Sequence, residues 1–204
     1  MFRNIHLLGN RTGGRPSARR RLAVAGLLLF TTAALPAAAA AQDEPSVAVR
    51  QSGGIYTVAA SFIVRESPSF ALAALTDYGA IPRFMPEVRT SQVLERSDRR
   101  AVVEQEAVAR FMMFSRRVHL VLEVQETGGT IRFRDRCGRS FALYEGVWAI
   151  AEQAGISSIT YELTAKPRFD VPEFLLRRLL KRDASQMIEH LKAEIHARAR
   201  AQSN

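Results

Sequence analysis

Asp135 is the residue whose type and position most strongly suggest a chemical role. It lies in the stretch IRFRDRCGR, where apolar and charged side chains alternate in a strand pattern. Alternation places Asp135 on the same face as Phe133 and Cys137, and that face would turn toward a core. A buried carboxylate costs several kcal/mol unless it is paired. Two interpretations follow: a strand end or Arg139 satisfies the carboxylate, or Asp135 anchors the polar group of a ligand together with Gln105.

The other reactive side chains do not form a catalytic set. Cys137 is the only cysteine, so an intramolecular disulfide is excluded, and a buried thiol is a simpler interpretation than a nucleophile. His119 falls on the polar face of a predicted strand, while His190 and His196 lie in a basic part of a predicted helix. No G-x-S-x-G, H-E-x-x-H or glycine-rich phosphate motif occurs. The sequence therefore predicts no cofactor, no metal site and no defined catalytic residue.

The first 41 residues are typical of an export signal. A basic stretch, Arg15 to Arg21, precedes an apolar run, Leu22 to Leu35, and the small-residue sequence PAAAAAQ. We expect a cleaved signal peptide over residues 1–41 and a periplasmic mature protein, with an uncleaved membrane anchor as the alternative. The pattern does not separate general from twin-arginine export.

Cleavage would also remove most of the positive charge. The chain carries 29 basic and 20 acidic residues, and six of the arginines, but no acidic residue, fall within residues 1–41. Subtracting six leaves 23 basic against 20 acidic residues, a net charge near +3. The sequence therefore gives no argument for a nucleic-acid partner.

Secondary-structure patterns fill the remainder of the chain. Residues 42–54 are expected to be a linker, residues 55–200 one domain and residues 201–204 a tail. A first strand pattern leads into a short helix that Ser67 and Pro68 introduce and that we expect to end at Tyr78. About six further strand patterns follow, with a turn at two consecutive glycines, and a long amphipathic helix begins near Pro172. The apolar stripe of that helix consists of Leu176, Leu180, Ala184, Met187, Leu191 and Ile195.

Several short motifs resemble the START-like helix-grip (SRPBCC) superfamily, in particular its polyketide cyclase and coenzyme Q-binding branch. They are Asp77-Tyr78, the prolines at 82 and 86, Gly146-x-Trp148, Tyr161-Glu162-Leu163, and Pro167 before the helix start at Pro172. The resemblance implies an α+β helix-grip fold. A strongly curved antiparallel sheet of about seven strands would wrap around the long C-terminal helix, with two short helices after the first strand.

Such a sheet cannot fill its own interior with one helix, so we expect a cavity between them. The resemblance also implies that the proline-containing segment after the first helix forms one rim of the cavity mouth. The residues expected to line the cavity or its rim are Tyr78, Phe84, Met85, Gln105, Ala109, Phe111, Phe133, Asp135, Tyr144, Trp148, Tyr161, Leu176, Leu180 and Met187.

Two classes of function remain open at this point. The first is an exported, non-enzymatic carrier for an apolar small molecule such as a quinone, an isoprenoid or another lipid, with a possible transient contact with a membrane. The second is a cyclase- or dehydratase-type enzyme in which one polar residue moves a proton in the same cavity. The absence of a catalytic set favours the carrier. Neither the identity of the ligand nor the oligomeric state can be derived from the sequence.

Overall fold

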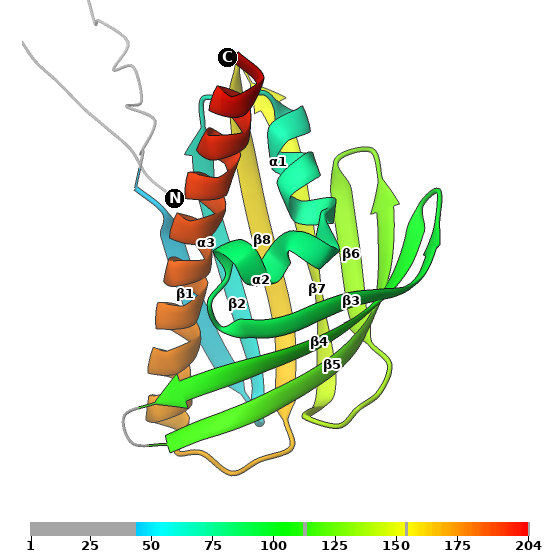
Figure 1. Ribbon diagram of the computed structural model, residues 1–204. Helices are drawn as coiled ribbons and strands as arrows, with labels where there is room; N and C mark the ends of the chain where they lie inside the picture. The colour runs from blue at the N-terminus through cyan, green and yellow to red at the C-terminus, as the bar shows by residue number, and fades with distance from the viewer. Residues whose placement is uncertain (1–43, 112–113, 154, 204) are drawn as a thin grey trace, which may run out of the picture. The chain divides into compact units, whose positions relative to one another are not determined.

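The computed structural model describes residues 44–111, 114–153 and 155–203, and the side chains of residues 111, 114 and 153 lie outside that description (Figure 1). The predicted export signal, residues 1–41, lies outside the described residues. The described residues form one compact unit. Among the described helices, none is both long and apolar enough to span a membrane.

One antiparallel sheet of eight strands forms the body of this unit, in the order β1-β2-β8-β7-β6-β5-β4-β3. The strands are β1 (Ser46–Ser52), β2 (Ile55–Val64), β3 (Val88–Ser97), β4 (Arg100–Phe111), β5 (Phe114–Thr127), β6 (Thr130–Asp135), β7 (Phe141–Gln153) and β8 (Ile156–Pro167). Alternation with a period of two is clear in β2, where every second side chain from Tyr56 to Val64 is buried. The predicted turn at Gly128 and Gly129 is confirmed, and both residues have the positive φ that glycine adopts without strain.

The eighth strand is a correction to the sequence analysis, which expected about seven strands and a linker over residues 42–54. Residues 46–52 instead form β1, which pairs with β2 along its whole length. Val47 and Val49 pack against the core, but they are only partly buried. The pattern was weak because β1 is an edge strand with few core contacts, and edge strands carry a diluted hydrophobic signal.

Four helical segments lie on the concave side of the sheet: α1 (Pro68–Thr76), the 3₁₀ segment η1 (Tyr78–Ala80), α2 (Ile81–Phe84) and α3 (Glu173–Ser203). α1 begins as predicted, with Ser67 extended at the N-cap and Pro68 in the first helical position. It ends at Thr76, two residues earlier than predicted, because the chain turns at Asp77 into η1. Figure 1 shows α3 running beside β1 and β2, with α1 and α2 next to it.

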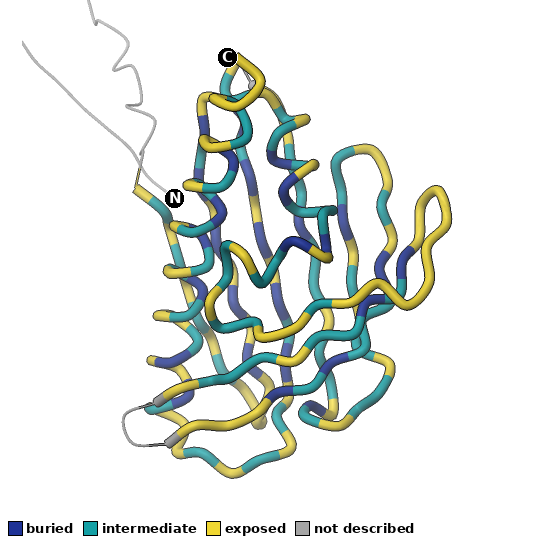
Figure 2. Tube along the Cα trace, in the orientation of Figure 1, coloured by how far each residue is buried: buried dark blue, intermediate teal, exposed yellow. Residues whose placement is uncertain are grey.

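Buried residues occur in both halves of α3 (Figure 2), with Leu176, Leu179 and Ala184 in the N-terminal half, but the two halves differ in how completely their side chains are buried. In the C-terminal half, Ile188, Leu191 and Ile195 are completely buried. In the N-terminal half, Leu180 and Met187 are only partly buried, although both belong to the predicted apolar stripe. The spacing of the stripe was therefore predicted correctly, but the solid core occupies only part of its length. The α+β helix-grip architecture expected from the sequence is confirmed.

Candidate ligand-binding cavity

A cavity of about 330 Å³ lies between the concave side of the sheet, the segment from α1 to α2, and the N-terminal half of α3. This volume is at the lower end of the range of about 300–1,000 Å³ that is usual for small-molecule sites. Small side chains make the space available, because Ala107 and Ala109 occupy cavity-facing positions of β4. Their neighbours across the strand pairing are Val118, which also lines the cavity, and Arg116, whose guanidinium lies over the Phe169 ring.

Most of the residues expected from the sequence come together in the wall of this cavity. They are Tyr78, Phe84, Met85, Gln105, Ala109, Phe133, Tyr144, Trp148, Tyr161, Leu176, Leu180 and Met187. The side chain of Phe111, which was also expected there, lies outside the described residues. Asp135 is the remaining expected residue, and it does not line the cavity.

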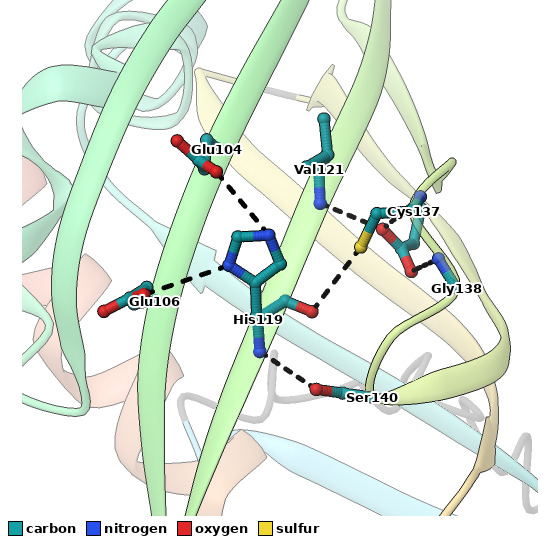
Figure 3. Close-up of polar contacts among 8 residues, drawn as sticks. Glu104, Glu106, His119, Val121, Cys137, Gly138 and Ser140 are labelled. Carbon is teal, nitrogen blue, oxygen red and sulfur yellow. Dashed lines mark hydrogen bonds and ion pairs between the residues drawn. The ribbon is translucent and has the colours of Figure 1, made fainter.

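Asp135 has a structural role at the end of β6, which agrees with the first of the two interpretations, a strand end, and not with the ligand anchor. Its Oδ1 accepts hydrogen bonds from the backbone N–H groups of Val121 (2.9 Å) and Cys137 (3.2 Å), and its Oδ2 accepts one from Gly138 (3.0 Å) (Figure 3). A carboxylate with three backbone donors is satisfied without a ligand or an arginine. Strand alternation misplaced it because β6 ends at Asp135, so the period of two no longer applies.

The rim segment is fixed at one end and freer at the other. Tyr78 is buried, and its hydroxyl donates a hydrogen bond to Glu126 Oε1 at 2.6 Å. Arg96 pairs with the same carboxylate at 3.0 Å and lies over the Tyr78 ring. By contrast, Phe84 and Met85 are partly buried. No side chain forms a capping hydrogen bond at either end of α2. Tyr78 therefore holds the segment in place, while Phe84 and Met85 occupy the position expected of an entrance.

Aromatic rings form one part of the wall. The Tyr161 ring lies between Trp148, at a centroid distance of 4.3 Å, and Phe133, at 6.4 Å. Phe133 also contacts the Tyr144 ring, at 6.0 Å. The Phe133 ring covers Gly146, where an added Cβ would lie 2.5 Å from its Cζ and against the backbone oxygen of Glu162. Only a glycine leaves room for this ring, which explains the Gly146-x-Trp148 pattern in physical terms.

The wall is almost free of charge. Among the described residues that line the cavity, none is basic, and Glu87 and Asp183 are the only acidic ones. Both are partly exposed, and burial together with the nearby Glu87 raises the pKa of Asp183, while Arg182 opposes the shift. Burial also raises the pKa of Tyr144, to about 12, and that of Tyr161 well above its usual value. Both phenols therefore remain protonated at neutral pH.

Several cavity residues were not predicted. Ile81, Leu179, Asp183, Phe141 and Phe169 also line the cavity. The first three carried a usable signal, since Ile81 directly precedes the first rim proline and the two α3 residues continue the spacing of the apolar stripe. Phe141 did not, because the pairing of β7 with β8 shifts register between Phe141 and Leu143 and breaks the alternation.

The outer face of the sheet carries a separate polar group that does not reach the cavity. His119 lies 3.5 Å from Glu104 and 4.0 Å from Glu106, and only 17% of its side chain is exposed (Figure 3). Its backbone oxygen faces the Cys137 thiol at 3.8 Å, and burial raises the pKa of that thiol. In the part of the chain that the structure describes, no three His, Cys, Asp or Glu side chains are placed to hold a metal ion.

Comparison with known proteins gives the family. Residues 64–192 match the family model described as polyketide cyclase / dehydrase and lipid transport. A search of curated proteins finds no match. Since the matched residues cover more than half of the chain and the whole cavity wall except Val58, the match includes the site itself.

Solved structures with the same fold differ strongly in sequence. The Zhui aromatase/cyclase from Streptomyces sp. R1128 is 13% identical, with a TM-score of 0.63 over 72% of this chain and 98% of that one. A STAR-related lipid transfer protein from Xanthomonas axonopodis is 18% identical, with a TM-score of 0.59 over 76% and 99%. The lipid transfer and protein localization domain of human StarD13 is 13% identical, with a TM-score of 0.58 over 76% and 86%. These likenesses show the START fold, and with the matched model they place the chain in the polyketide cyclase/dehydrase and lipid transport family.

Proposed function

We propose that this protein is a non-enzymatic carrier that holds one apolar small molecule in the cavity between the sheet and α3. The observation that supports this most directly is the wall itself, which is built from aromatic and aliphatic side chains with very few polar groups. Burial of apolar ligand surface in such a site supplies binding free energy of about 25 cal/mol per Å². The few polar groups would orient the ligand, as is usual for small-molecule sites.

The cavity volume limits the kind of cargo. At about 330 Å³ it fits a compact drug-sized molecule better than a large lipid with two chains. Of the ligand classes that the sequence leaves open, a quinone ring or a short isoprenoid would fit most easily. The partly buried Phe84 and Met85 lie at the C-terminal end of the short helix α2, where a small displacement would open a path for the ligand.

A cyclase-type enzyme is the second candidate, and Asp183 is the observation that favours it. Its carboxyl group lines the cavity, and burial raises its pKa toward the range in which a carboxyl group exchanges protons. An enzyme of this kind should lose turnover of a polyketide substrate by about 100-fold or more in the Asp183→Asn variant, with binding nearly unchanged. A carrier should show no turnover in either form.

Export to the periplasm and contact with a membrane complete the proposal. N-terminal sequencing of protein from the native host should begin near Ala41 if the signal is cleaved, whereas an anchored protein would retain the apolar run. For membrane contact, Phe174 at the start of α3 is 71% exposed and precedes Arg177, Arg178 and Lys181. An exposed aromatic ring beside basic residues suits an anionic lipid surface. Stronger co-sedimentation with anionic than with neutral vesicles would support such contact, and equal weak binding to both would oppose it.

Filling the cavity tests the carrier proposal itself. Ala109→Phe places a ring in the space that this alanine leaves empty, so it should weaken binding of the neutral fluorescent probe N-phenyl-1-naphthylamine by about tenfold or more. The matched control is Ala59→Phe, which adds the same volume at an exposed position of β2 on the other side of the sheet.

Two measurements complete this test. Native mass spectrometry of protein purified from its own host should show a bound apolar molecule in the wild type and in Ala59→Phe, but not in Ala109→Phe. Unchanged probe binding by a folded Ala109→Phe variant would mean that ligands do not use this cavity.

A further inference from the structure

The chain has only four tyrosines, and their hydroxyl groups have different surroundings. Tyr78 donates to Glu126. Tyr56 does not line the cavity, and its nearest charged neighbours are Glu173 and Arg177 at the start of α3. Tyr144 and Tyr161 both line the cavity, and in the described part of the chain no backbone group or charged side chain accepts a hydrogen bond from either hydroxyl. Gln105 also lines the cavity, but its amide donates to Ser91 at 3.1 Å, so the two tyrosine hydroxyls are the uncharged side-chain donors left for a buried ligand.

The two cavity hydroxyls are not equivalent. The two hydroxyls influence each other's pKa with opposite signs: Tyr161 lowers that of Tyr144, and Tyr144 raises that of Tyr161, which is the effect expected if the Tyr161 hydroxyl points toward the Tyr144 oxygen. The proton of Tyr144 then remains without an acceptor in the protein. Leaving a buried donor unsatisfied is costly, so this proton favours a ligand that brings an acceptor.

The charges around the cavity restrict that acceptor to an uncharged group. The described wall offers no basic side chain to neutralise a carboxylate or phosphate, and the two acidic groups, Glu87 and Asp183, would repel it. An anion that entered this wall would lose its hydration without gaining a counter-charge, at a cost of several kcal/mol. A neutral carbonyl oxygen needs only one donor and suffers neither penalty.

We infer that the cavity selects uncharged apolar molecules that carry a carbonyl oxygen, and that the Tyr144 hydroxyl donates a hydrogen bond to this oxygen. The inference rests on the proposed function, because it concerns the ligand of the same cavity. It narrows the cargo to ketone-, quinone- or ester-like molecules and excludes fatty acids and other anionic amphiphiles. It also assigns Tyr161 as the positioning residue that holds the Tyr144 oxygen.

A matched ligand series on the wild-type protein provides the test. Three bicyclic compounds of similar size, 2-acetylnaphthalene, 2-ethylnaphthalene and 2-naphthoate, are compared by displacement of N-phenyl-1-naphthylamine at neutral pH. The ketone should bind about two- to tenfold more tightly than the hydrocarbon, the effect of one net hydrogen bond. The carboxylate should bind about tenfold or more weakly than either, because its charge is not compensated.

Variants that keep the ring but remove the hydroxyl identify the donor. Tyr144→Phe should abolish the preference for the ketone and leave the affinity for 2-ethylnaphthalene unchanged. Tyr161→Phe should reduce the preference only partly. Tyr56→Phe is the control, because it removes a buried hydroxyl away from the cavity and should change none of the three affinities.

The outcomes separate this inference from the proposed function. If neither the probe nor any of the three compounds binds, both are wrong. If ketone and hydrocarbon bind equally, or if the carboxylate binds most tightly, the protein is still a carrier but the inference is wrong. The wild-type series decides this even if a variant fails to fold.

Discussion

The two ends of α3 show how one helix can both stabilise a fold and line a binding site. Toward the C-terminus, Ile188, Leu191 and Ile195 are completely buried. Arg198 adds hydrogen bonds to Asp77 at 2.9 Å and to the backbone oxygen of Ala73 at 3.0 Å, which tie α3 to the end of α1. We call this part, from Ile188 to Arg198 with α1, the solid end.

The other part of the helix borders empty space. From Leu176 to Met187 the helix faces the cavity, and Leu180 and Met187 keep part of their surface exposed. We call this part the hollow end. Apolar side chains that border a cavity give up contacts that a packed core would supply. The comparison suggests that the solid end carries most of the stability, so that the hollow end can keep room for a ligand.

The largest expected effect comes from shortening the same side chain at both ends. Leu191→Ala should lower the free energy of unfolding by about 2–5 kcal/mol, because it opens a new cavity in a packed core. Leu180→Ala should cost only about 1 kcal/mol, because this side chain already borders an existing cavity. Urea unfolding of both variants measures the difference. Equal losses would show that the hollow end is as tightly packed as the solid end and that the comparison is wrong.

The second prediction concerns the wall of the hollow end. Gly146→Ala should destabilise the protein by about 1–3 kcal/mol, because the new methyl group collides with the Phe133 ring and the Glu162 backbone. The double variant Gly146→Ala, Phe133→Leu should recover part of this loss by removing the ring. Thermal unfolding of the single and double variants tests the coupling. If Gly146→Ala alone kept wild-type stability, the Phe133 ring and the Glu162 backbone would have to move aside at little cost, contrary to the close contact in the structure.

Most of the architecture could be predicted because the hydrophobic patterns are long. The period of two in β2 and the stripe of α3 extend over many residues, and patterns of that length separate strand from helix reliably. β1 was missed because its two valines are partly buried at a sheet edge. α1 was predicted two residues too long because η1 continues a helical turn with a different hydrogen-bond pattern.

The cavity-facing residues could be predicted where their strand is regular. They could not be predicted where a strand ends or where its register with the neighbouring strand shifts. Phe133, Tyr144 and Tyr161 lie at cavity-facing positions, as alternation indicates. Asp135 follows the same alternation but ends its strand, so its side chain turns to three backbone N–H groups. The mutual influence of Tyr144 and Tyr161 on their pKa values could not be predicted, because it depends on the register of β7 and β8.

The third prediction tests whether the Asp135 carboxylate, which lies outside the cavity wall, affects only the stability of the protein and not its affinity for a ligand. Asp135→Asn should lower the free energy of unfolding by about 0.5–1.5 kcal/mol, because an amide oxygen replaces only part of the carboxylate's acceptor capacity. Affinity for N-phenyl-1-naphthylamine should stay within about twofold of wild type, since Asp135 does not line the cavity. A variant that keeps its stability but loses affinity would show that Asp135 anchors the ligand after all.

The smallest expected effect is that of pH on ligand affinity. The titratable groups that line the cavity are Tyr78, Glu87, Tyr144, Tyr161 and Asp183, and the nearby Asp135 adds its charge to Tyr144. Burial raises the pKa of Tyr144 to about 12, so its hydroxyl remains a donor below that pH and is lost only when the pH rises through it.

Within the hollow end, then, the donor state should not change between about pH 7 and pH 9, because this whole range lies below the pKa of Tyr144. The affinity for 2-acetylnaphthalene should vary by less than about twofold over this range, as should that for 2-ethylnaphthalene. The matched pair is the internal control, because a change in both would report on the fold and not on the hydrogen bond. If only the ketone lost affinity as the pH rose, a group with a lower pKa than Tyr144 would have to be its donor.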